Sequence, residues 1–467
     1  SLDARYNVIQ WVHRSTRGWS YGGGIIDPRT GEMIKGHVSL GSLRVRQDKL
    51  LFQGLAGSDE LGTGGPNDPV QIALARIRQL SVHEVGHTLG LTHNFAASTY
   101  GRASVMDYPA PLVKIDDQGQ LDFSDAYATG VGEWDILAIR RAYTEFEPET
   151  DREAALEAIV HEGLDRGLFF LSDADARPPG AAHPLANLWD NGPDPVEALA
   201  HTLSVRRIAL DRFGEQVVPD GTPLAQLEAV LVPLYLHHRY QLQAAVKVIG
   251  GLDYSYALRG DGQTPTGFLD PAWQQRALDV VLSILDPAAL DLPESVLEVI
   301  PPRPPGSEPT RELFRGRTNP VFDPISAAAT AAGMVVDGLL QPERAGRLVD
   351  FHRRDPAQPG FEAILDALTA TVFDPSATAD PRLAEIGRVV QTVTVDGMIA
   401  LAADPDAPPG VRSRVNAQLT SILDALSSPI GDASDLAHRH DLAATIAAHQ
   451  KRELPPRRQP VSAPAVP

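Results

Sequence analysis

One string of residues constrains this chain more than any other feature: SVHEVGHTLGLTHNF, at residues 81–95. On a helix, residues four apart lie on one face, so His83 and His87 can aim imidazole nitrogens at a single ion. Glu84 sits beside that face, where its carboxylate can hold a metal-bound water and take its proton. The spacing therefore predicts a helix that carries two metal ligands and a general base.

The end of the same string predicts a third ligand. Gly90 can adopt the positive φ that commonly ends a helix, and the following turn brings His93 back towards the first two histidines. Three protein ligands leave one coordination position open, as in catalytic zinc sites. Any one of these histidines alone would be an ordinary polar residue, and a bare HExxH arises by chance. The longer HExxHxxGxxH fixes five positions at once and favours a zinc hydrolase site.

A second motif, SVMDY at residues 104–108, begins eleven residues after the third histidine. It resembles the Met-turn of the metzincin metalloproteases, where a methionine forms a hydrophobic floor beneath the metal, and Met106 holds that place. In the astacin-like and serralysin-like branches a tyrosine two places further on serves as a mobile metal ligand and oxyanion donor. Tyr108 stands at that position, and its plainer interpretation is an aromatic packed in a turn. Asn94, after the third histidine, matches none of the best-known branches.

The chain has 467 residues, 43% of them hydrophobic and 22% charged, which is ordinary for a globular protein of two or three domains. Its formal net charge of -19 argues against a nucleic-acid-binding surface and against adhesion to anionic membranes. Because there is no run of about eighteen or more apolar residues, no membrane insertion is expected. The sequence contains no cysteine, which excludes disulfides and a thiolate nucleophile and leaves the cellular compartment open.

The residues ahead of residues 81–95, here called the metal string, predict a small sheet. Residues 5–13, RYNVIQWVH, alternate in polarity and are rich in β-formers, which indicates a strand. Residues 20–26 and 32–40 flank a proline-first, glycine-last turn and therefore predict a hairpin. Three consecutive glycines at residues 22–24 make its first arm either a weak strand or an edge that another backbone approaches closely.

Two further segments frame the metal string. Residues 55–69 are rich in glycine and acidic groups and indicate either a calcium-binding loop or a solvated loop. Asp68 and Pro69 then open the helix as N-cap and first-turn proline. Three apolar side chains of residues 133–143 fall on one helical face, which predicts packing against the metal-string helix. They are Ile136, Ile139 and Tyr143.

From about residue 148 the composition shifts to alanine, leucine and proline, with hardly any strand signal, so this half is expected to be helical. The clearest helix candidates are residues 222–249, with a kink at Pro233, and residues 320–351, 383–401 and 411–426. Five histidines of this half are not spaced like a ligand set and are interpreted as structural. They are His161, His183, His201, His237 and His238.

Two longer strings extend the resemblance: YNVIQWVHRSTRGWSYGGGIIDPRTGEMIKGHVSLGSLRVRQD before the metal string and VPLYLHHRYQLQAAVKVIGG well after it. With the motifs, they are similar to bacterial zinc-dependent metalloproteases of the metzincin clan, whose C-terminal part is called the Met-zincin domain. We expect an α+β fold with three parts. They are a metzincin-like catalytic domain at residues 1–147, built from a mixed sheet and the active-site helix, a mainly α-helical domain at residues 148–453, and a disordered tail at residues 454–467.

Members of that family usually carry more sequence ahead of this region, including a secretion signal, whereas no signal-peptide pattern follows Ser1. The resemblance therefore implies a catalytic domain that lacks upstream strands and leaves a sheet edge open. By the same analogy, the expected location is secreted, periplasmic or in the cell envelope.

Together these features predict a zinc-dependent metalloendopeptidase that binds one Zn2+ through His83, His87 and His93. Glu84 would act as the general base, and by the resemblance Tyr108 would help to stabilise the oxyanion. The expected substrate is a polypeptide, bound extended beside residues 20–26, with no nucleic-acid partner. Nothing in the sequence predicts an oligomeric state. The alternative is a catalytically silent zinc-binding interaction or chaperone-like scaffold, against which the intact Glu84 argues.

Overall fold

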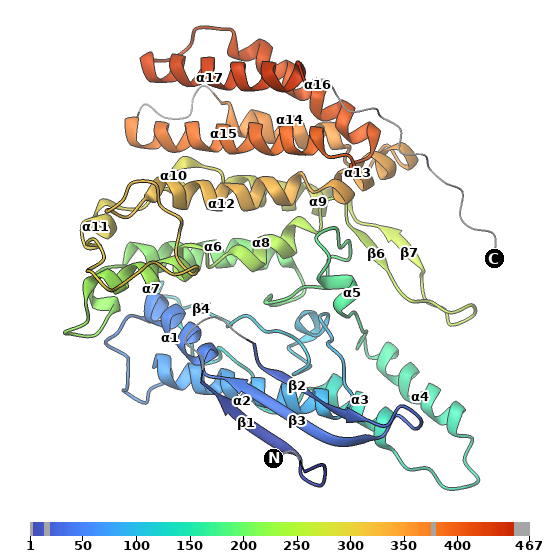
Figure 1. Cartoon of the computed structure of the whole chain (residues 1–467). Helices are drawn as coiled ribbons and strands as arrows, with labels where there is room; N and C mark the ends of the chain where they lie inside the picture. Colours follow the sequence, from blue (N-terminus) through green and yellow to red (C-terminus); the bar gives the residue numbers. More distant parts are fainter. Residues whose placement is uncertain (1–2, 14–18, 375–379, 453–467) are drawn as a thin grey trace.

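The structure of the protein is a computed structural model that describes residues 3–13, 19–374 and 380–452. A small sheet and the helices beneath it occupy one end of the molecule, and layers of helices are stacked beyond them (Figure 1). The α+β fold class expected from the sequence is confirmed. The expected disordered tail, residues 454–467, lies outside the described residues, as does Glu453 at the end of the expected helical domain.

The N-terminal sheet is mixed and has three strands: β1 (Val8–Val12), β2 (Tyr21–Ile26) and β3 (Met33–Gly41). Their order is β1-β3-β2, with β1 parallel and β2 antiparallel to β3, so β2 forms one edge. The predicted strand and hairpin are confirmed. Gly31 ends the connecting turn with a φ of +77°, and its N–H donates to the carbonyl of Asp27 at 2.8 Å.

Two helices follow, α1 (Leu43–Ala56) and α2 (Pro69–Thr88), and α2 carries the metal string. Asp68 caps α2, because its carboxylate accepts the N–H of Val70 at 2.9 Å. The same carboxylate accepts the N–H groups of Gly62 and Gly64 at 3.1 and 2.9 Å. The predicted helix start is confirmed. The Asp68 carboxylate therefore accepts hydrogen bonds from three backbone N–H groups, which favours the solvated-loop interpretation of residues 55–69.

Glycine lets the sheet lie directly on α2. A Cβ at Gly22 of β2 would overlap the carbonyl oxygen of Glu84, and a Cβ at Gly36 of β3 would press on Thr88 at 3.1 Å. Beside this contact, Val38 and Leu40 of β3 form a small buried cluster with Leu80 of α2. Close backbone approach, the second alternative for the glycine-rich arm, is therefore correct, and the partner is the metal-string helix.

The Met-turn region contains η1 (Ala97–Tyr100), β4 (Lys114–Ile115) and β5 (Leu121–Asp122), followed by α3 (Glu133–Tyr143) and α4 (Arg152–Asp165). The predicted helix at residues 133–143 is confirmed, but its predicted packing face is wrong. Ile136 and Tyr143 are 53% and 55% exposed, whereas Trp134 and Leu137 are buried, and α3 packs against α4. The short helix has apolar groups on more than one side, so periodicity alone could not select the buried face.

The second half is mainly helical, as predicted, and its helices lie in stacked layers (Figure 1). The elements are α5 (Asp173–Ala176), α6 (Pro195–Asp211), η2 (Glu215–Val217), η3 (Leu224–Gln226), α7 (Leu227–Tyr235), α8 (Arg239–Val246), β6 (Leu252–Tyr254), β7 (Thr266–Phe268), α9 (Pro271–Ser283), α10 (Pro287–Leu290), α11 (Glu294–Leu297), α12 (Pro324–Leu339), α13 (Pro342–Arg354), α14 (Phe361–Val372), α15 (Pro381–Ala403), α16 (Pro409–Leu426) and α17 (Ala433–Gln450).

The long helices α15 and α16 confirm two of the helix predictions. In the other two predicted segments the helix is interrupted. The segment expected as one kinked helix at residues 222–249 is divided into η3, α7 and α8, with a break after Tyr235. The segment at residues 320–351 is divided into α12 and α13, because Pro342 has no N–H and Gln341 caps a new helix. The β6–β7 hairpin was not predicted.

One hydrophobic core joins the two halves, and it includes Phe52 of α1, Ile72 of α2, Leu231 of α7 and Ile446 of α17. Helix α1 packs on both α2 and α7. The helix of the metal string is therefore anchored in the helical half as well as under the sheet. The division into domains at residue 147 stays a prediction.

Among the described residues, α15 is the one helix long and apolar enough to cross a membrane by length and composition alone. In the structure, Val390, Val395 and Met398 on α15 are buried, and the helix packs against α12, α14 and α16. A core helix meets the same two criteria, so these contacts account for the composition of α15.

Candidate metal centre

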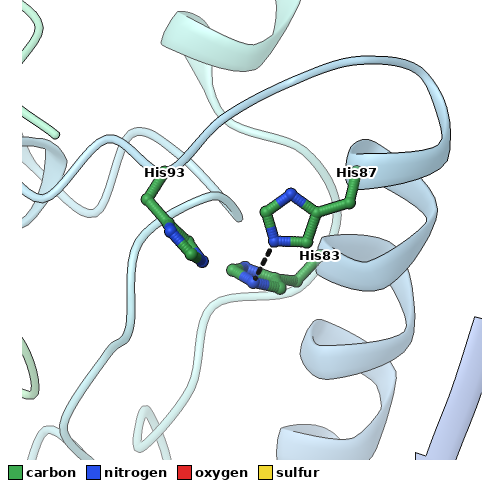
Figure 2. Close-up of side chains that lie close together, drawn as sticks. All are labelled: His83, His87 and His93. Carbon is green, nitrogen blue, oxygen red and sulfur yellow. Dashed lines mark hydrogen bonds between the residues drawn. The ribbon is translucent and has the colours of Figure 1, made fainter. Parts of the chain in front are cut away.

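Helix α2 and the turn after it bring the three histidines of the string together. His83 and His87 lie one turn apart on α2, which ends at Thr88. Gly90 has a φ of +84°, as predicted, and the chain then returns so that His93 faces the other two (Figure 2). One potential ligand atom from each ring lies within 4.8 Å of the others, and this is the only such group of metal-binding side chains among the described residues.

Each imidazole is held through its Nδ1. The Nδ1 of His83 donates to the carbonyl of Val105 at 2.6 Å, and that of His87 to the carbonyl of Leu91 at 2.8 Å. The Nδ1 of His93 bonds a carboxylate oxygen of Asp173 at 2.7 Å. These contacts fix the tautomer that leaves Nε2 as the free acceptor, which is the usual support for a metal-binding histidine.

The three Nε2 atoms fit a metal ion. Those of His83 and His87 lie 3.1 Å apart (Figure 2), and the Nε2 of His93 is buried with no hydrogen-bond partner among the described residues. Burial lowers the pKa of His83 to about 3 and also lowers the pKa of His93. These two imidazoles are therefore neutral near pH 7, with lone pairs available to a cation.

The Met-turn lies under this site. Met106 is fully buried, its carbonyl accepts the N–H of Asn94 at 3.1 Å, and a Cβ on Gly86 of α2 would overlap its sulfur. Asp135 of α3 anchors the turn, because its carboxylate accepts the hydroxyl of Ser104 at 2.6 Å and the N–H of Val105 at 2.8 Å. The position of Met106 fits the floor role that the resemblance implies.

Glu84 lies next to the ligands on α2 and is only 5% exposed. Burial raises the pKa of its carboxyl to about 7, while the nearby Arg76 guanidinium and the N–H of Gly22 partly oppose that rise. A carboxyl that titrates near neutral pH can both accept and release a proton. The N–H of Gly22 on β2 thus donates a hydrogen bond to the carboxyl of Glu84, the predicted base.

Tyr108 lies beside the metal ligands, as its position in the motif implied. Its ring centroid is 5.3 Å from that of His83 and 4.9 Å from that of His93. Its hydroxyl accepts a hydrogen bond from Nη2 of Arg177 at 3.3 Å, and the Arg177 guanidinium lies over the ring. Burial raises the pKa of Tyr108, so its hydroxyl keeps its proton at neutral pH.

Three residues of the site were missed from the sequence: Asp173, Arg177 and Trp189. Asp173 bonds both His93 and the Nε of Arg177, and the Trp189 ring lies 5.0 Å from that of Tyr108. They lie outside both motifs, and no spacing rule relates them to the string. The carboxylate of Asp173 beside an arginine four residues later was the one available signal, and such pairs are common on any helix.

The histidines of the helical half do not join this site. Among the described residues, none of the five belongs to a group with metal-ligand geometry. The Nε2 of His201 bonds the carbonyl of Val113 at 2.6 Å, and the Nδ1 of His183 bonds the N–H of Leu185 at 3.1 Å. These two contacts agree with the structural interpretation.

Comparison with known proteins gives one match. The model of the family described as Met-zincin matches residues 65–380, which is more than half of the chain and includes α2, the three histidines and the Met-turn. Searches of the curated proteins and of the solved structures found no significant match. The chain therefore belongs to the Met-zincin family, which implies zinc as the metal that His83, His87 and His93 are positioned to bind.

Proposed function

We propose that the protein is a zinc-dependent metalloendopeptidase that hydrolyses peptide bonds of a polypeptide substrate. The observation that carries the proposal is the combination at the site of three converging Nε2 atoms, each on a ring anchored through Nδ1, with the buried carboxyl of Glu84 beside them. A structural zinc site has four protein ligands and needs no adjacent base. Three ligands and a carboxyl with a pKa of about 7 suit hydrolysis.

The residues divide the chemistry between them. Zinc, when bound, would polarise the scissile carbonyl and lower the pKa of a water molecule. Glu84 takes a proton from the attacking water and passes it to the leaving amine. The Tyr108 hydroxyl donates a hydrogen bond to the oxygen that becomes negative in the transition state. Its O–H is available for this because Arg177 already donates to the lone pairs of that hydroxyl. Asp173 keeps His93 in the tautomer and orientation that ligation requires.

The substrate binds extended, paired with the free edge of β2. Support comes from the strand order, in which β2 is an edge strand, and from the contact between Gly22 and Glu84, which puts that edge beside the base. Backbone pairing sets the register of the scissile carbonyl without demanding particular side chains. A complex with a peptide-like inhibitor should have backbone hydrogen bonds to β2, and an inhibitor bound far from β2 would contradict this part of the proposal.

Proteolysis of an unstructured protein tests the main proposal and separates it from the silent zinc-binding scaffold. Purified protein should cleave the substrate, lose activity with a chelator and regain it when zinc is added back. Retention of about one equivalent of zinc without any cleavage would identify the scaffold instead. Zinc retention after His87→Ala would contradict the ligand assignment, because loss of one of three ligands should weaken binding severely.

A further inference from the structure

A cleft of ≈ 750 Å³ lies between α1, the start of α8 and the segment that precedes α12, and Trp189, whose ring is 5.0 Å from that of Tyr108, is part of its lining. Two of the elements that line it, α1 and α7, pack against each other. These two helices lie where the sheet end of the molecule meets the helical half (Figure 1). Its lining combines arginines and aromatic rings with aliphatic side chains. We call it the arginine cleft, after Arg44, Arg46, Arg239, Arg311 and Arg315.

The arginine cleft carries an excess of positive charge on an acidic protein. Its five arginines face two acidic residues, Asp48 and Glu312, whereas the whole chain has a formal net charge of -19. Arg44 pairs with Asp48, and Arg46 pairs with Glu312 at 2.6 Å. Arg239 and Arg315 make no ion pair with any described residue. A cleft of one sign focuses the field and attracts groups of the opposite sign.

Trp189 connects the arginine cleft to the metal centre. Its backbone N–H donates to the carbonyl of Tyr108 at 2.8 Å, and the Arg44 guanidinium lies 5.0 Å from the centre of its indole ring. Trp189 has a φ of +62°, in the left-handed region that a bulky side chain rarely adopts. Such strain persists where the surrounding structure enforces it, commonly at functional sites. Here it holds one ring between Tyr108 and Arg44.

The edge strand β2 leads into the same cleft. Trp19, which lines the cleft and is 62% exposed, stands two residues before Tyr21 at the start of β2. A peptide paired with β2 therefore runs from the metal centre past Trp19 into the arginine cleft. This step rests on the proposed function, since it uses the substrate position proposed above.

We propose that the arginine cleft binds an acidic stretch of the polypeptide substrate, a short run of aspartate or glutamate on one side of the scissile bond. Carboxylates match the guanidinium groups of Arg239 and Arg315, and the cleft volume suits a few residues. A nucleic acid also carries negative charge, but a long polyanion would meet the repulsion of the whole acidic chain. A short acidic stretch meets mainly the local field, because charges are screened beyond about 8 Å at physiological ionic strength.

The test uses three peptides that share one cleavable centre and differ only in a flank of acidic, neutral or basic residues. The acidic peptide should have a KM about fivefold lower than the neutral one, with a similar kcat, as expected for exposed charge pairs. High salt should remove the difference. Arg239→Gln with Arg315→Gln should remove it at low salt, and the exposed Arg315→Gln alone should reduce it. Arg259→Gln, on the exposed β6–β7 loop outside the cleft, is the matched control and should keep the preference.

A binding measurement keeps the cleft separate from catalysis. A fluorescently labelled acidic peptide should bind the Glu84→Gln protein, and the two cleft substitutions should weaken that binding. If no peptide is cleaved by the parent protein, the proposed function fails. The binding measurement still shows whether the arginine cleft binds an acidic peptide. Equal KM values for the three peptides with equal binding would overturn the inference. An oligonucleotide that binds the cleft more tightly than the acidic peptide would also overturn it and assign the cleft to nucleic acid.

Discussion

Residues 83–108, here the ligand segment, and residues 169–190, the support segment, meet at the metal centre and contribute in different ways. The ligand segment carries all three histidines, together with Glu84 and Tyr108. The support segment carries no metal ligand, yet its Asp173 holds the Nδ1 of His93. In addition, the carbonyl of Leu171 accepts the N–H of Phe95 at 2.8 Å.

The ligand segment therefore supplies the reacting groups, and the support segment sets their geometry. Substitutions in the ligand segment should act on the chemical step or abolish binding of the metal. Substitutions in the support segment should act on metal affinity and on the placement of Tyr108, because its residues touch ligands and not the reacting atoms.

Glu84→Gln should have the largest effect. The amide keeps the size of the side chain and cannot accept a proton, so kcat should fall by about a hundredfold or more while zinc stays bound. Steady-state kinetics and metal analysis on the same preparation check this. A variant that keeps near-parental cleavage would show that the base lies outside the predicted position.

Tyr108→Phe should come next. Loss of one preorganised donor to the oxyanion costs roughly 2.7 to 4 kcal/mol, so kcat should fall by about a hundredfold to a thousandfold with KM nearly unchanged. Zinc content and the thermal midpoint should match those of the parent. A variant within about twofold of the parental rate would make Tyr108 a packed turn aromatic and leave the oxyanion to another donor.

Asp173→Ala tests the support segment. His93 would lose the carboxylate that orients it, so the zinc dissociation constant should rise about tenfold to a hundredfold. Activity at saturating zinc should stay closer to that of the parent than in either ligand-segment variant. Asp165→Ala, at the exposed end of α4, is the control. Unchanged zinc affinity in the Asp173 variant would remove the distinction between the two segments.

Gly22→Ala tests the contact between the sheet and α2. The new Cβ would overlap the backbone of Glu84, so the free energy of unfolding should fall by about 1 to 3 kcal/mol. Gly23→Ala is a matched control, because a Cβ there meets nothing within 4 Å. Thermal or denaturant unfolding of both variants measures the difference. Equal stability would mean that β2 does not press on the helix in solution.

The pH dependence should follow the carboxyl of Glu84. Burial raises its pKa to about 7, and only the ionised form can accept a proton, so kcat/KM should fall on the acid side of the pKa that this carboxyl has in the zinc-bound enzyme. The fall approaches about tenfold per pH unit. Bound zinc favours the carboxylate and moves this limb below pH 7. The residual activity of Glu84→Gln should lack the limb, and its persistence there would assign the titration to another group.

The sequence alone was sufficient where the signal is local. The start of α2 at Asp68, the helical spacing of His83 and His87, the positive φ of Gly90 and the strands of the small sheet all follow from neighbours within a few residues. Such features obey the fixed periods of helices and strands and the special freedom of glycine.

Only the tertiary structure decided the contacts that complete the site. Asp173 reaches His93 across eighty residues of sequence, and Trp189 is held against Tyr108 in a strained backbone conformation. The buried face of α3 and the breaks within two predicted helices were likewise set by packing. No spacing rule connects residues so far apart, because their meeting depends on how whole elements pack around one core, and that packing is a property of the complete chain.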